Sequence, residues 1–234
     1  MSNADFDQNR RSLIVAGISG VVLVAAPGLA LDKEKEVTAT KDLMREHGVL
    51  RRALLVYVET VPRLRTSPGA IDPKALNETA KLFRNFGEDY HERKLEEVHI
   101  FPTVRKAGGS TAALPDILVA QHNRGREITD YILTITGKGA IGSGDAEPMA
   151  RVLETFVLMY QNHTAREDTI IFPAWKNALS EHQLEETGEL FERIEHQQFG
   201  KDGFDDAVSK MAGIEGELGY SDLAQFAAPP PPHA

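Results

Sequence analysis

The chain has 234 residues, a formal net charge of −9, 41% hydrophobic residues and no cysteine. This hydrophobic fraction excludes wholesale disorder, and the lack of thiols excludes disulfides, zinc ribbons, iron–sulfur clusters and cysteine nucleophiles. The excess of acids, 35 against 26 bases, argues against a nucleic acid partner, because phosphate backbones bind basic surfaces.

The first thirty residues are organised like an export signal. Arg10 and Arg11 precede an uncharged run over residues 13–26, and small residues lead to Ala30. This order predicts a signal peptide over residues 1–30 that is cut after Ala30, and the paired arginines resemble a twin-arginine signal. The alternative is an uncleaved anchor over residues 13–31, barely long enough to span a bilayer. Both interpretations predict a periplasmic or otherwise exported protein, with membrane contact only through residues 13–31.

The rest of the chain has helical periodicity. The first predicted helix begins after Thr38 or Thr40 and carries an apolar face from Leu43 to Val58. Similar patterns and their flanking cap, glycine and proline residues predict further helices down the chain. Four long helices are predicted, over about residues 38–62, 73–106, 114–137 and 147–179, and a fifth begins at Ser180.

Four amphipathic helices of this length joined by short loops predict an all-α fold, an antiparallel up-down four-helix bundle over residues 38–180. Residues 181–215 are predicted to be a C-terminal helical extension. Residues 216–234 are predicted to be a flexible tail, because the polyproline stretch over residues 229–232 cannot join a core.

Each bundle helix carries one histidine on its apolar face: His47, His91, His122 and His163. A lone histidine on such a face is usually a hydrogen-bonded core residue. Four imidazoles that converge in one dry core would leave many ring nitrogens without partners. The set therefore predicts a shared site.

Carboxylates occur on the same faces. Glu167 follows His163 by four residues and so shares its side of the helix. Glu96 follows His91 by five residues, which places it about 140° away on an ideal α-helix. A one-residue π-bulge between them would return Glu96 to the inward face.

The two histidine–carboxylate segments repeat one another. Each runs from a histidine (His91 or His163) through acids to Ile-Phe-Pro, and the first copy is one residue longer, as the predicted bulge requires. Two helical hairpins related by a pseudo-twofold axis would bring four histidines and two carboxylates to one level, as in a two-metal bundle site. A nitrogen and oxygen donor set favours iron or manganese, with zinc less favoured.

The segment around His47, the two His…Glu…Phe-Pro segments and His122 resemble the hemerythrin-like, or HHE cation-binding, domains over about residues 38–180. The resemblance implies an antiparallel four-helix bundle with a non-haem di-iron centre, bridged by an oxo or hydroxo group. It also implies binding or sensing of small ligands such as O₂, nitric oxide or peroxide. The metal ligands implied are His47, His91, Glu96, His122, His163 and Glu167.

Two features depart from the family pattern. Oxygen-carrying members have a second histidine four residues after the third-helix histidine, where this chain has Arg126. That difference favours members in which Glu92 or another carboxylate completes the shell. The extra residue before Glu96 leaves Glu97 open as the ligand, and Asp168 competes likewise with Glu167. His99 is a further candidate for a place behind the ligands.

Three functions are compatible with these residues. The first is an exported di-iron protein that binds O₂ or a related small ligand. The second is an enzyme in which the same centre reduces peroxide or nitric oxide, with Arg126 and a tyrosine near an open metal position. The third is a metal-stabilised bundle that stores iron or contacts a partner protein. The tyrosines considered for the second function are Tyr57, Tyr131 and Tyr160.

Overall fold

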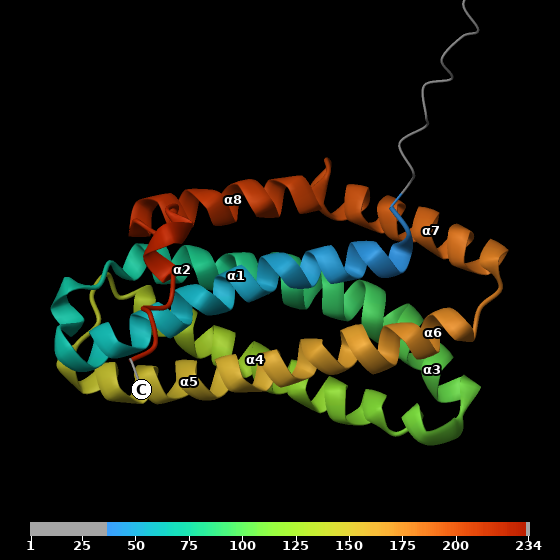
Figure 1. The fold of residues 1–234 in the computed structure, drawn as a ribbon, viewed down its shortest axis with the longest axis horizontal. Helices are drawn as coiled ribbons and strands as arrows, with labels where there is room; N and C mark the ends of the chain where they lie inside the picture. The colour runs from blue at the N-terminus through green and yellow to red at the C-terminus, as the bar shows by residue number, and fades with distance from the viewer. Residues whose placement is uncertain (1–36, 233–234) are drawn as a thin grey trace, which may run out of the picture. The chain divides into compact units, whose positions relative to one another are not determined.

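All regular structure in the computed structural model, which describes residues 37–232, is helical (Figure 1). No β-strand occurs in this part of the chain, so the all-α prediction is confirmed. The predicted signal segment lies outside the described residues. Within them, no helix has both the length and the apolar character needed to span a membrane.

Helix α1 (Ala39–Thr66) begins where the sequence predicts. Thr38 is its N-cap and accepts a hydrogen bond from the Lys41 amide. The buried face continues through Tyr57 and Val61, whereas Val58, expected on that face, is exposed. A helix of 3.6 residues per turn brings position 57, not 58, back under residues 50 and 54.

The second long helix is continuous from α2 (Pro73–Leu82) through η2 (Phe83–Ile100) to α3 (Phe101–Ala107). Asp72 caps it with a 2.8 Å hydrogen bond from the Lys74 amide, and Gly108 ends it at a φ of +76°. Segment η2 is π-helical over 18 residues. The predicted π geometry between His91 and Glu96 is confirmed, and it extends far beyond a single bulge.

The other half of the bundle consists of α4 (Leu114–Thr136) and a second composite helix. That helix runs through α5 (Ser143–Arg166), π-helical η4 (Glu167–Ile171) and α6 (Phe172–Asn177). It starts four residues earlier than predicted because Gly142 adopts the extended conformation of an N-cap. The π-helical segment η4 was not predicted. Helix α1 packs on α5, and α2 packs on α4, which closes the four-helix bundle (Figure 1).

Two further helices, α7 (Glu181–Phe199) and α8 (Gly203–Leu218), lie along the α1–α2 side of the bundle rather than over one end (Figure 1). Ser180 and Gln183 form a capping box at the start of α7. Phe191 stacks on Trp175 with 5.9 Å between ring centroids, and Phe199 meets Tyr90 at 5.2 Å. Through these and similar contacts, the described residues 37–232 form one compact unit.

The C-terminal boundaries differ from the prediction. Helix α8 passes residue 215 and ends at Leu218, where Gly219 has a φ of +76°. A short 3₁₀ turn, η5 (Leu223–Phe226), follows inside the stretch predicted to be a tail. Two other 3₁₀ turns, η1 (Pro68–Ala70) and η3 (Gly109–Thr111), lie in the loops between bundle helices.

Candidate metal centre

Six side chains from the four bundle helices meet inside the core. None is more than 3% exposed, although all are ionisable. Ionisable groups so deeply buried must be paired or must coordinate a metal. The six are the predicted ligands His47, His91, Glu96, His122, His163 and Glu167.

The four imidazoles form two pairs. The Nε2 atoms of His47 and His91, on α1 and η2, lie 3.0 Å apart. The Nε2 atoms of His122 and His163, on α4 and α5, also lie 3.0 Å apart. Each helical hairpin therefore supplies one pair, as the repeat in the sequence predicts.

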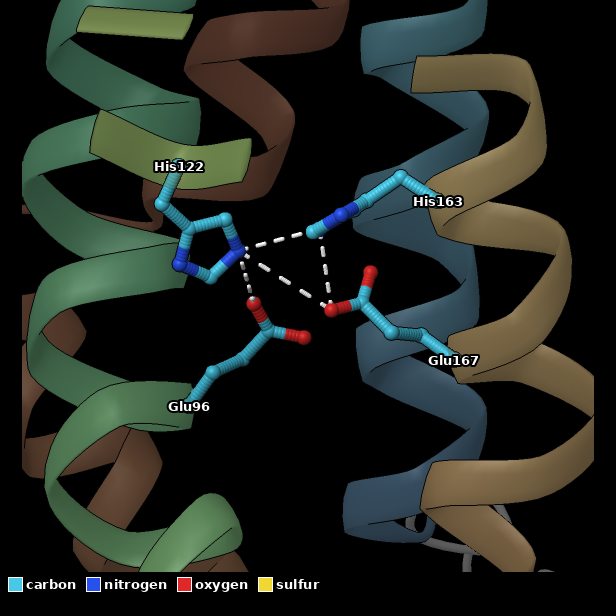
Figure 2. Close-up of side chains that lie close together, drawn as sticks. All are labelled: Glu96, His122, His163 and Glu167. Carbon is cyan, nitrogen blue, oxygen red and sulfur yellow. Dashed lines mark hydrogen bonds and ion pairs between the residues drawn. The ribbon is translucent and has the colours of Figure 1, made fainter. Parts of the chain in front are cut away.

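Each glutamate reaches both histidine pairs. Glu96 Oε1 lies 3.4 Å from His91 Nε2, and its Oε2 lies 3.3 Å from His122 Nε2. Glu167 Oε2 lies 3.5 Å from His47 Nε2, and its Oε1 lies 3.0 Å from His163 Nε2. Figure 2 shows the two carboxylates entering from opposite sides toward His122 and His163. Each carboxylate therefore spans the two histidine pairs.

The hydrogen bonding of Glu96 and Glu167 is incomplete. All four of their carboxylate oxygens are buried, and none accepts a hydrogen bond from the described residues. A buried carboxylate without partners costs several kcal/mol, on the order of the effective desolvation penalty of a buried ion. Cations between the two histidine pairs would satisfy these oxygens, so the residues present fit a metal cluster.

The outer nitrogen of each imidazole has its own acceptor. His47 Nδ1 lies 2.7 Å from Asp168, and His122 Nδ1 lies 2.9 Å from Glu97. An acceptor at Nδ1 fixes the proton there and turns the Nε2 lone pair toward the centre, as in carboxylate–histidine–metal sites. The other two pairs are His91 with Glu46 and His163 with Gln121.

These four acceptors follow the pseudo-twofold repeat. The residue before the first histidine of each hairpin, Glu46 or Gln121, bonds to the second histidine of the same hairpin. The residue after each bridging acid, Glu97 or Asp168, bonds to the first histidine of the other hairpin. The sequence analysis did not identify Glu46 and Gln121 as histidine acceptors. The available signal was that each directly precedes an inward histidine.

The structure separates the acids that the sequence left as alternatives. Glu96 and Glu167 point to the centre, whereas Glu97 and Asp168 lie behind histidines. His99 is not behind a ligand, because its ring lies against Phe191 at 5.7 Å. The assignment of the six inward side chains as ligands stays a prediction that metal analysis must test.

A second polar cluster adjoins the His122–His163 pair. Arg126 Nη2 donates to Glu92 at 3.0 Å and to Glu97 at 2.6 Å. Glu92, Glu97 and His122 lie close enough to hold a cation, and the guanidinium already supplies that positive charge. Both Glu92 oxygens have partners, Arg126 for one and Tyr160 for the other, and the expectation that Glu92 completes the metal shell stays a prediction.

Of the three tyrosines considered, one reaches this cluster. The Tyr160 hydroxyl donates to Glu92 Oε1 at 2.6 Å. Tyr57 is fully buried, and its hydroxyl has no hydrogen-bond partner among the described residues. Tyr131 is partly buried against the apolar core and contacts no predicted ligand through a hydrogen bond in the described chain.

The ionisable groups of the centre shift in both directions. Despite burial, the pKa of Glu96 is held well below its ordinary value by His91 and His122, and the surrounding glutamates raise the pKa of His122 to about 10. Burial raises the pKa of Glu167 well above its ordinary value, and the nearby Glu96 raises it further. Burial and the adjacent His122 lower the pKa of His163 to about 3. Both shifts favour the neutral form. Metal ions in the centre would reverse the preference of Glu167 and would use the lone pair that neutral His163 offers.

Comparison with known proteins gives a consistent picture. The profile of the family described as hemerythrin HHE cation binding domain matches residues 38–175, which are α1 to α6 without the last residues. Uncharacterized proteins of Mycobacterium tuberculosis and Mycobacterium bovis are each 40% identical over 226 residues, covering 91% of this chain and 88% of the relative. No solved structure matches the chain significantly.

Proposed function

The chain belongs to the hemerythrin HHE cation-binding domain family, and on that premise we propose that it holds two non-haem iron ions and binds O₂ or a related small ligand. One observation carries this proposal. The four unpartnered oxygens of Glu96 and Glu167 are divided between the two histidine pairs. Two cations are the simplest way to satisfy them.

The donor set supports iron over zinc. Each histidine pair would hold one metal with two imidazole nitrogens, and each glutamate would contribute one oxygen to each metal. Such a shell of nitrogen and oxygen donors without thiolates would suit iron or manganese and would leave room for a small exogenous ligand. A structural zinc site would be closed by its four ligands. Bound iron would supply the ability to bind and reduce oxygen-derived ligands.

The chain's own residues would prepare the site for such a ligand. The Nδ1 acceptors hold the imidazole rings in one orientation. The burial of all six inward side chains keeps bulk water from the centre. The two acids that follow the bridging glutamates tie the hairpins together at the level of the site.

The test is a metal count and an optical spectrum on protein purified under air from iron-rich medium. We expect two iron ions per chain and an absorption band of a bridged di-iron centre. Glu167→Gln should lose at least one metal, whereas the matched Asp168→Asn should retain both with weaker affinity. One metal or fewer per chain, or zinc alone, would refute the proposal.

A second candidate function is the reduction of peroxide or nitric oxide at the same centre. It is favoured by the cluster of Arg126, Glu92 and Tyr160, which lies beside the His122–His163 pair. A reversible carrier does not need a proton donor and a fixed cation there, whereas a reductive site uses both. Turnover of hydrogen peroxide or nitric oxide by the iron-loaded protein separates the two functions.

The proposed location is outside the cytoplasm. It is supported by the order of charged, apolar and small residues over positions 1–30. A folded-export route through Arg10 and Arg11 would let iron be inserted in the cytoplasm, where copper and zinc compete less than they do outside.

A further inference from the structure

Tyr160 has a defined place next to the predicted metal centre. It lies on α5 one turn before His163, and their ring centroids are 5.4 Å apart. Its side chain is buried at 2% exposure. The phenol is therefore packed against a predicted ligand and is shielded from reductants and radicals in solution.

The phenol has a charged acceptor that is itself buried. Tyr160 donates to Glu92 Oε1 at 2.6 Å, and the other oxygen of Glu92 receives Arg126 Nη2 at 3.0 Å. Glu92 is 2% exposed, and this guanidinium gives it the oppositely charged partner that a buried carboxylate needs. The result is a phenol hydrogen-bonded to a carboxylate that can take its proton.

Helix α4 packs against the Tyr160 phenol and so restricts the position of its hydrogen bond to Glu92. A Cβ at Gly125 would lie 3.0 Å from the Tyr160 ring carbons Cε2 and Cζ, and closer still to the hydroxyl. Glycine at this position lets α4 approach the phenol edge directly. The ring also packs against Phe156 and Phe83, with centroid distances of 4.8 Å in both cases.

This geometry matters for one-electron chemistry. Removing an electron from a neutral phenol in a low-dielectric core creates a charge that is costly unless the phenolic proton leaves at the same time. Proton transfer needs a base within hydrogen-bond distance. Tyr160 has such a base, whereas the equally buried Tyr57 has no hydrogen-bond partner among the described residues.

We propose that Tyr160 is a redox-active side chain that gives one electron and one proton when hydrogen peroxide reacts at the metal centre. The O–H bond of the phenol breaks, the proton passes to Glu92, and the electron passes toward the metals through the contact with His163. One hydrogen peroxide needs two electrons and two protons to become two water molecules. Tyr160 gives one electron, a ferrous ion of the centre gives the other and becomes ferric, and solvent supplies the two protons while the phenolic proton stays on Glu92. The inference rests on the proposed di-iron function and deepens its reductive form.

The experiment is electron paramagnetic resonance of the iron-loaded protein, frozen shortly after hydrogen peroxide is added. We expect a tyrosyl radical in the wild type, and loss of at least nine-tenths of it in Tyr160→Phe. Tyr57→Phe is the matched control, since it removes a hydroxyl from the same buried aromatic cluster and should leave the signal unchanged. Glu92→Gln should reduce the yield at least tenfold, because an amide is not a base.

Zinc-loaded protein, which cannot be oxidised or reduced at the metal, should give no radical. A radical that survives in Tyr160→Phe, or that disappears equally in Tyr57→Phe, overturns the assignment. Metal counts on the same samples separate the two levels of inference. Two bound irons without any tyrosyl signal refute the role of Tyr160 and leave the di-iron proposal standing, whereas protein that binds no iron refutes both.

Discussion

The close approach of α4 to Tyr160 predicts a large effect from one added methyl group. In Gly125→Ala, the new Cβ would overlap the Tyr160 hydroxyl and crowd two ring carbons at 3.0 Å. Overpacking of this kind costs about 1–3 kcal/mol. Displacing the phenol from Glu92 costs about 1.5–3 kcal/mol more, since the acceptor is charged. The better helix propensity of alanine offsets about 1 kcal/mol of this, so we expect a net destabilisation of about 1.5–5 kcal/mol.

The assay is urea unfolding, with Gly48→Ala as the matched control. Gly48 lies inside α1, and its added Cβ would meet nothing within 4 Å, so alanine there should stabilise the protein by about 0.5–1 kcal/mol. In a Tyr160→Phe background the cost of Gly125→Ala should fall by at least half, because the closest atom has gone. Equal effects of the two alanine substitutions, or no relief in that background, would refute the packing argument.

Three further predictions follow from other parts of the chain. Glu167→Gln should lower both the metal content and the free energy of unfolding, whereas Asp168→Asn should weaken metal affinity about 10–100-fold with both metals still bound, as measured by chelator competition. Burial raises the pKa of Glu195 to about 7, so the folded state holds its proton more tightly than the unfolded chain and stability falls as pH rises from about 4.5 to 7. Glu195→Gln should therefore raise the free energy of unfolding by about 1 kcal/mol at pH 8 and leave it unchanged at pH 4. The gain at pH 8 is limited by solvent screening, because the group is half-exposed. Replacing Arg10 and Arg11 together by lysine should retain the protein uncut in the cytoplasm; normal export of that variant would instead indicate the general secretory route.

The bundle was predictable because each of its helices is marked by a local sequence pattern. Apolar residues recur at helical spacing, and ends are marked by a cap-and-proline pair at Asp72 and by glycine at position 108. Helix α8 has end signals as well, an Asp202 N-cap and Gly219 after its last residue. Its three glycines lower its helix propensity, so its stability depends on packing against α1 and α2.

For the candidate site, the sequence predicts which residue types lie on the inward faces of the helices. Sequence spacing brings four histidines and two acids inward, but it does not say which of two adjacent acids turns in. That choice depends on π-helical geometry, which rotates Glu96 inward from an i+5 position and leaves Glu97 behind His122. The Nδ1 acceptors depend on contacts between hairpins. No local rule joins Asp168 to His47 across the bundle.

The same acceptors would make the two proposed metal positions unequal despite their matching donors. The His47–His91 pair is backed by Glu46 and by Asp168, whose charge is shared with Arg51, so the two pairs differ in having Glu46 behind one and a neutral amide behind the other. The His122–His163 pair is backed by Glu97, whose charge is shared with Arg126, and by the neutral amide of Gln121.

More negative charge behind an imidazole makes it a stronger donor, so the first position should bind its metal more tightly and the second should be the one that exchanges ligands. Stepwise chelation should then remove one metal before the other. Glu46→Gln, which makes the first pair resemble the second, should merge the two steps. If the steps stay separate in that variant, or if the wild-type protein loses both metals together, charge behind the histidines does not set the order.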